Sequence, residues 1–284
     1  MHKTLLSLRS LKRPIRIGIV VCCSLLCVAA AMLAPRMPLT QGYHVFADQR
    51  TILGVPNFFD VISNIPFILV GGLGVYWLIT GASRRSFILR IERVPYFVFF
   101  AGVALTGIGS YRYHLHPSNA RLMFDLLPMT CCFMSMVAIV IIERISIELG
   151  FALLAPLLVA GIASVIYWAS TQAEGQGDYR FYLLVQFAPV VLLPIIAILF
   201  PSRYTGTEYL AVALGLFILA KCLEYFDRHI FGVFKVSGHT LKHVIGALAC
   251  YEIILMLQKR RAVAVFDPGK DRPMAGRRRR LAQL

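Results

Sequence analysis

Charged residues make up only 15% of this 284-residue chain, and just 14 of them are acidic. This composition cannot give a soluble domain of the same size its usual charged surface. Hydrophobic residues reach 58%, and they fall into continuous runs of about 20 residues, the length that crosses a bilayer as a helix. The alternation of apolar and polar residues that a membrane β-barrel needs is missing. The sequence therefore predicts an all-α integral membrane helical bundle.

All seven cysteines fall inside apolar segments. Their spacing matches neither a zinc ribbon nor a disulfide framework. We interpret them as small hydrophobic residues of the helices. They give no indication of the compartment in which the protein works.

Eight apolar stretches are long enough to cross a membrane. They cover about residues 17–35, 59–82, 94–112, 122–143, 151–170, 181–200, 208–226 and 238–257. The first follows a basic leader, as in a signal peptide, but its apolar run exceeds the usual 7–15 residues of such peptides. We therefore expect a retained anchor. The chain then divides into a basic N-terminus with an extra transmembrane anchor (1–43), a seven-helix membrane domain (44–257) and a basic, disordered tail (258–284).

The basic residues are distributed unevenly along the chain. Eight spans place both termini on one side of the membrane, and most of the 29 lysines and arginines then lie on that side. This positive-inside pattern predicts cytoplasmic termini. We assign the net charge of +15 to topology and to contact with anionic lipids, rather than to nucleic acid. The short loops suit a bacterial inner membrane.

Four polar residues lie at matching ends of three apolar segments, at one predicted depth near the non-cytoplasmic face. They are His114, Asp125, His239 and His243. Such residues are costly in a membrane and usually mark a functional site. Pro117 prevents a continuous helix from His114 to Asp125, so the chain must turn back between them.

Three imidazoles that meet near one membrane face are the ligand set of a catalytic zinc ion, which keeps an open coordination position. His239 and His243 are four residues apart, so they share a helix face and can reach one ion. Ser110 shares a helix face with His114 in the same way. Asp125 is the candidate general base, and Ser110 would orient the water or hydrogen-bond a developing oxyanion. The pattern predicts metal-assisted hydrolysis.

Other interpretations of the polar residues stay open. Two histidines on different helices can ligate haem, and a zinc site can bind a fatty acid without turnover. Asp60 and Asn64 would bind a second cation, or cap their helix and bond to neighbours. Lys221 and Glu224, three residues apart, are interpreted as an ion pair that supports the outer vestibule. The remaining histidines near helix ends are interpreted as interfacial or hydrogen-bonded residues: His44, His116 and His229.

These motifs resemble those of the alkaline ceramidases and of the wider superfamily of membrane hydrolases that includes the adiponectin and progestin-type receptors. Four segments carry the resemblance, in this order: Asn57-Phe-Phe-Asp-Val-Ile-Ser-Asn64, Ser110-Tyr-Arg-Tyr-His114, Asp125-Leu-Leu-Pro-Met129 and Gly238-His-Thr-Leu-Lys-His243. The resemblance covers roughly residues 44–257 and implies the seven-helix fold of that family. It also implies the following roles: zinc ligands at His114, His239 and His243, a catalytic carboxylate at Asp125 and a serine beside the zinc water at Ser110.

By this resemblance the chain is expected to be a zinc-dependent amidohydrolase. It would cleave the amide bond of ceramide or a similar N-acyl lipid arriving from the bilayer, and release a fatty acid and a sphingoid-type base. Two alternatives stay open for this chain: it hydrolyses another lipid ester or amide, or it is a zinc-containing lipid receptor or sensor without turnover. Eukaryotic ceramidases also hold calcium through acidic ligands near the N-terminus. Here Asp48 is the sole carboxylate between residues 36 and 57, and Asn57 stands where an acidic ligand is expected, which argues against bound calcium.

Overall fold

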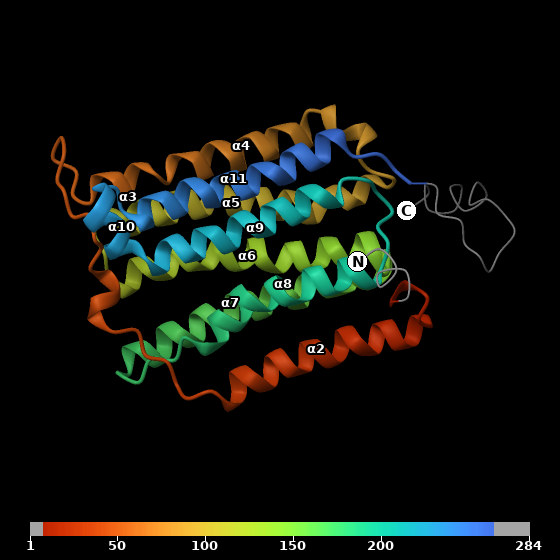
Figure 1. Ribbon diagram of the computed structural model, residues 1–284, viewed down its shortest axis with the longest axis horizontal. Coiled ribbons are helices and arrows are strands. Elements are labelled where there is room, and N and C mark those ends of the chain that lie inside the picture. Colours follow the sequence, from red (N-terminus) through yellow and green to blue (C-terminus); the bar gives the residue numbers. More distant parts are fainter. Residues whose placement is uncertain (1–7, 264–284) are drawn as a thin grey trace, which may run out of the picture.

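The computed structural model of the protein describes residues 8–263, which form a bundle of long helices (Figure 1). In chain order the helices are α2 (Arg13–Leu33), α3 (Phe58–Ile62), α4 (Ile65–Ile79), α5 (Arg93–Leu115), α6 (Asn119–Arg144), α7 (Ile147–Ala173), α8 (Arg180–Leu199), α9 (Thr207–Tyr225), α10 (Asp227–Phe234) and α11 (Gly238–Lys259). Short 3₁₀ turns lie between some of them: η1 (Gln41–His44), η2 (Ala82–Arg85) and η3 (Arg90–Glu92). The all-α prediction is confirmed, because the only β pairing within 8–263 consists of two isolated bridges.

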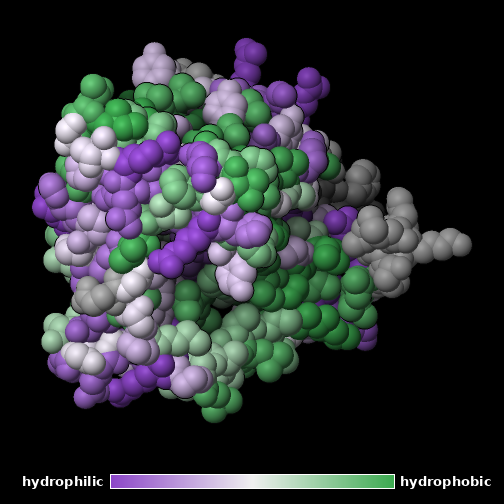
Figure 2. Space-filling model, turned by 60° about the vertical axis from the view of Figure 1, so that its left-hand side comes forward, coloured by the Kyte–Doolittle hydropathy of each residue, from purple (hydrophilic) through white to green (hydrophobic). Residues whose placement is uncertain are grey.

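The described helices account for the predicted membrane spans. Seven helical segments are long and apolar enough to cross a membrane. The predicted span at 208–226 corresponds to α9, which passes this test only together with α10, and the two helices are bent by 77° where they meet. Figure 2 shows hydrophobic side chains over much of the surface behind a largely hydrophilic end. The protein is therefore a multi-pass membrane protein.

The start of α2 and the end of α11 lie at the same end of the bundle, which we call the terminal end (Figure 1). The other end, formed by α3, α10 and the neighbouring helix ends, carries the three predicted metal ligands, and we call it the histidine end. Residues 1–7 and 264–284, including most of the predicted tail, lie outside the described part of the chain.

Helix α2 lies against α8 at the edge of the bundle, and none of its residues is buried. Hydrogen bonds from arginines join the two helices at both ends. At the terminal end, Arg16 donates to the main-chain carbonyl oxygen of Leu199 at 3.0 Å. At the histidine end, Arg180 of α8 donates to the carbonyl oxygen of Ala34, just after α2. Carbonyl groups at the C-terminal end of a helix lack an intrahelical partner. Here an arginine of each helix donates to such a carbonyl at the end of the other helix.

Two glycines let the helices that carry the site approach closely. A Cβ atom on Gly109 would lie 2.3 Å from the carbonyl oxygen of Phe124, so α5 and α6 pack without a side chain between them. A Cβ atom on Gly238 would lie 2.1 Å from the carbonyl oxygen of Leu223, where α11 begins beside the end of α9. Only glycine fits at such a separation. These contacts bring together the helix ends that carry the candidate site.

A buried arginine fixes the C-terminal end of α11. Arg260 forms a salt bridge of 2.5 Å with Glu143 of α6 and a hydrogen bond of 3.0 Å with the hydroxyl of Tyr96 in α5. Its guanidinium carbon lies 4.1 Å from the ring centre of Tyr204. Arg260, which falls in the segment expected to be a tail, is therefore packed against the bundle.

Candidate metal centre

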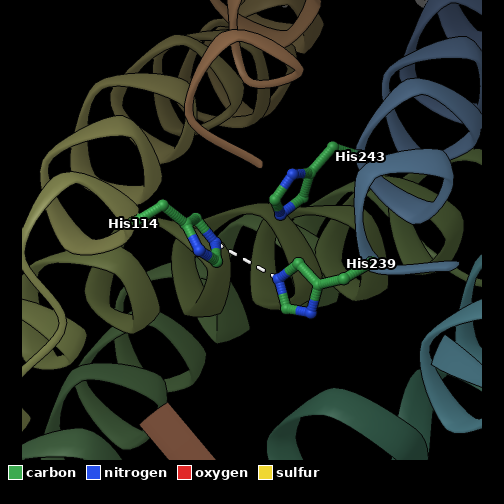
Figure 3. Close-up of side chains that lie close together, drawn as sticks. All are labelled: His114, His239 and His243. Atoms are coloured by element: carbon green, nitrogen blue, oxygen red, sulfur yellow. Dashed lines mark hydrogen bonds between the residues drawn. The ribbon is translucent and has the colours of Figure 1, made fainter. Parts of the chain in front are cut away.

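The three histidines predicted to converge lie together at the histidine end (Figure 3). His114 comes from the last turns of α5, and His239 and His243 come from the first turns of α11. Their side chains point toward one another, and one ligand nitrogen from each lies within 4.8 Å of the other two. The Nε2 atoms of His114 and His239 are 3.2 Å apart. Among residues 8–263 this is the one group of three or more metal-ligating side chains that meets such a criterion.

The arrangement suits a small divalent ion. When nitrogen ligands surround zinc as a tetrahedron at about 2.0–2.1 Å, neighbouring nitrogens are about 3.3 Å apart. The separation between His114 and His239 is close to this value, and a ligand nitrogen of His243 lies within 4.8 Å of both. Nδ1 of His114 is buried without a hydrogen-bond partner. Three imidazoles suit zinc, copper, nickel or iron, so the ligand set alone does not choose among them.

Ser63 of the α3–α4 junction holds the ring of His243. Its hydroxyl donates to the main-chain carbonyl oxygen of Asp60 at 3.1 Å and lies 2.8 Å from Nδ1 of His243. Because the serine proton is directed to that carbonyl, the serine oxygen is left to accept a hydrogen bond from Nδ1–H. This assignment leaves the lone pair of Nε2 free for an ion.

A buried carboxylate holds the first turn of α11. Oδ1 of Asp60 accepts hydrogen bonds from the hydroxyls of Ser237 and Thr240 at 3.0 and 2.5 Å. Ser237 also caps α11, because its side chain accepts the main-chain N–H of Thr240 at 2.8 Å. Asp60 bonds to the neighbouring helix, which is one of the roles the sequence left open for it.

The two predicted catalytic residues lie beside the histidines. Asp125 of α6 is buried, with 8% of its surface exposed, and its Oδ1 atom has no hydrogen-bond partner. The hydroxyl of Ser110, one turn before His114 on α5, neighbours this carboxylate. Ser118 caps α6 just after Pro117, so the chain turns back there as predicted. This turn, together with the close packing at Gly109, brings Asp125 to the level of the histidines.

A cavity of about 170 Å³ opens beside the imidazoles. It is lined by Tyr43, Val45, Phe46, Tyr113, His114, Asp125, Glu224, Asp227, His239 and Lys242. This volume is smaller than the roughly 300–1,000 Å³ of sites for drug-sized ligands. The cavity can therefore hold a headgroup or an amide, but a porphyrin or a whole lipid would not fit. The size argues against the haem alternative.

Residues 43–48, which we call the cover segment, fold over this cavity. The ring centre of Phe46 lies 4.5 Å from that of His114 and 5.1 Å from that of His239. Nδ1 of His44 lies 2.9 Å from the hydroxyl of Tyr113, in keeping with its expected hydrogen-bonded role. The sequence did not predict Phe46 as part of the site. Its one signal was a cluster of aromatic residues in a connection between spans.

The predicted ion pair of Lys221 and Glu224 is present, and it has a third member. Lys242 of α11 forms a second salt bridge with the same Glu224 carboxylate. In the sequence, Lys242 is a charged residue within the apolar stretch 238–257. Its partner lies on another helix and gives no local signal.

Comparison with known proteins adds no relative, because no protein-family model, curated protein or solved structure matches this chain. The chemistry of the site is therefore inferred from its own residues.

Proposed function

We propose that this protein is a zinc-dependent hydrolase that cleaves the amide bond of ceramide or a similar N-acyl lipid within the membrane. One observation carries the proposal: the buried acid Asp125, with an unpartnered oxygen, lines the same cavity as two of three convergent imidazoles. This geometry supports metal-assisted hydrolysis. The resemblance of the motifs to those of alkaline ceramidases supports a lipid amide as the substrate.

His114, His239 and His243 would hold the ion and leave one coordination position for water or substrate. Bound zinc lowers the pKa of a water molecule to near 7 and polarises a carbonyl group. Zinc is preferred over the other metals that imidazoles bind because hydrolysis needs a Lewis acid and no redox change.

Proton transfer is assigned to Asp125. Its carboxylate takes the proton of the attacking water and delivers it to the departing amine, as a general base and then a general acid. Ser110, beside it, orients the water or donates to the oxygen that gains negative charge. Phe46 and the rest of the cover segment limit the access of bulk water to these groups.

The substrate must leave most of its length outside the cavity. The volume of about 170 Å³ admits the polar part of a lipid, while its acyl chains extend along the apolar helices into the bilayer. We place the termini in the cytoplasm and the histidine end near the outer face of a bacterial inner membrane, because the basic residues follow the positive-inside pattern.

The test combines metal analysis with an assay of fatty-acid release from labelled ceramide. We expect the purified protein to contain zinc and to release fatty acid. Asp125→Ala should keep the zinc and lose about 10²- to 10⁴-fold in rate, the usual contribution of general acid–base catalysis. His116→Ala alters an exposed histidine two residues from His114. It should change neither the zinc content nor the rate of fatty-acid release. Full activity of Asp125→Ala would refute its role as general base.

A second candidate function is a lipid receptor or sensor that binds a fatty acid at its zinc ion without turnover. The cover segment favours this candidate, because Phe46 closes the cavity over two of the ligands. A sensor would bind zinc and fatty acid but release nothing from ceramide or from other lipid amides and esters offered in the same assay.

A further inference from the structure

Three charged side chains meet beside the cavity, on helices that cross the membrane. Glu224 of α9 forms salt bridges with Lys221, three residues before it, and with Lys242 of α11. The side chains of Lys221, Glu224 and Lys242 are only 31%, 23% and 20% exposed. Ionisable groups in spanning segments are costly and are usually kept for a function. We call this group the charged trio.

The charged trio carries one surplus positive charge, because two ammonium groups share a single carboxylate. Another acidic residue of the cavity, Asp227, is already engaged: its two oxygens accept the main-chain N–H groups of Ala47 and His239 at 3.2 and 2.9 Å. These bonds tie the cover segment and the start of α11 to α10. Asp125, the remaining acid of the lining, is assigned to proton transfer. Within residues 8–263 both lysines form their salt bridges with Glu224 alone, so an anionic ligand in the cavity can pair with the ammonium group that shares this carboxylate.

The two lysines are placed differently. Lys242 lines the cavity together with His114, His239 and Asp125, whereas Lys221 does not. Lys242 also lies on α11 directly before His243, so a lipid whose amide reaches the imidazoles has its headgroup in the same small space. An ammonium group is a compact charge that pairs well with phosphate and carboxylate.

On the basis of the proposed hydrolase function, we propose that Lys242 selects N-acyl lipids whose headgroup carries a phosphate or carboxylate over lipids with a neutral headgroup. When Lys242 turns to the headgroup, Glu224 keeps Lys221 as its partner. No charge of the trio is then left unpaired in a poorly solvated site. Lys242 is thus a specificity residue, distinct from the groups assigned to hydrolysis.

The test uses two substrates with the same acyl chain and base, ceramide and ceramide 1-phosphate, and the zinc-loaded protein. We expect kcat/KM for the phosphorylated lipid to be about ten- to a hundred-fold higher, the range of a hydrogen bond to a charged group. Lys242→Met should abolish this ratio and Lys242→Arg should restore much of it. Lys235→Met removes the same charge from an exposed position at the same end and should preserve the ratio. Equal kcat/KM values in the wild type, or an unchanged ratio in Lys242→Met, would overturn the inference.

Binding measurements separate this inference from the proposed function. Displacement of a fluorescent fatty acid gives the affinity of the zinc-loaded protein for each lipid, whether or not it is cleaved. Tighter binding of ceramide 1-phosphate that depends on Lys242, without fatty-acid release, would refute the hydrolase and support the selection. Equal cleavage of both lipids would support the hydrolase and refute the selection by Lys242. Weaker inhibition of Lys242→Met by free fatty acid, with the headgroup ratio unchanged, would show that Lys242 binds the product carboxylate instead and would also overturn the inference.

Discussion

The hydroxyl of Ser63 lies 2.8 Å from Nδ1 of His243 and connects the candidate metal centre to the junction of α3 and α4. Groups that hold the outer nitrogen of a histidine ligand fix its orientation and tautomer. Through Asp60, the same junction bonds the first turn of α11. One short segment therefore orients the ring of His243 and holds the helix from which that ring projects.

Replacing Ser63 with alanine should lower zinc affinity by about 10- to 100-fold, the usual effect of removing such a partner. Competition with a chromophoric chelator measures this affinity. Ser170→Ala is the matched control, because Ser170 also donates to the carbonyl three residues earlier but lies exposed on α7. Unchanged affinity in Ser63→Ala would mean that packing alone orients His243.

Gly238→Ala should disturb the start of α11. The added Cβ atom would lie 2.1 Å from a main-chain oxygen, which cannot move aside as a flexible side chain can. We expect a loss of about 1–3 kcal/mol in stability, typical of overpacking, together with weaker zinc binding through His239. Thermal unfolding with and without added zinc measures both effects.

The control for this change is Gly215→Ala in the middle of α9. A Cβ atom at Gly215 meets nothing within 4 Å, and alanine favours a helix over glycine by about 0.8–1.0 kcal/mol. This variant should be at least as stable as the wild type. Equal behaviour of the two alanine variants would show that α11 can shift without cost to the site.

Phe46→Ala should open the metal centre to solvent. The ring of Phe46 is 5% exposed and contacts the rings of His114 and His239, so its removal leaves a gap over two ligands. We expect faster transfer of zinc to an external chelator, measured by stopped-flow absorbance. Val45→Ala changes a neighbour that is 50% exposed and should have a much smaller effect. Identical transfer rates in the two variants would show that the cover segment does not limit access to the ion.

Much of this architecture is readable from the sequence because its signals are local. Continuous apolar runs locate the spans, Pro117 marks the turn between α5 and α6, and Ser237 marks the start of α11. The histidines could be grouped because the order of spans brings them to one end of the bundle. These predictions need only the length and direction of each segment.

Contacts between segments far apart in the sequence could not be predicted in this way. The 77° bend between α9 and α10 falls at Tyr225-Phe226-Asp227, which contains neither proline nor glycine. Hydrogen bonds from Ala47 and His239 to Asp227 hold the bend from outside. The cover segment, Ser63 and Lys242 likewise acquire their roles from partners on other helices.

Acidification should weaken the contact between α2 and α8. Arg180 donates two hydrogen bonds to the carboxylate of Asp178, at 2.8 and 2.7 Å, and these bonds hold the pKa of Asp178 below its ordinary value. A carboxyl group with a lowered pKa in the folded state stabilises the fold above its unfolded pKa of about 3.9. This contribution is lost as the pH falls through the lower, folded pKa. Because Arg180 also holds the end of α2 through Ala34, α2 should loosen below about pH 4.

Asp178→Asn tests this contact without acid. Neutral asparagine holds Arg180 less strongly, so the variant should be less stable than the wild type at pH 7 by about 1.5–3 kcal/mol, the range of hydrogen bonds to charged groups. The difference should shrink as the pH falls below about 4, where the carboxylate of the unfolded wild type takes up a proton, and should vanish below the lower pKa of the folded state. Thermal unfolding between pH 3 and pH 7 gives both curves. Glu174→Gln removes an exposed carboxylate from the same connection and should follow the wild type throughout. Parallel curves for Asp178→Asn and the wild type would show that the charge of Asp178 does not stabilise the junction, and that packing along α8 holds α2 in place.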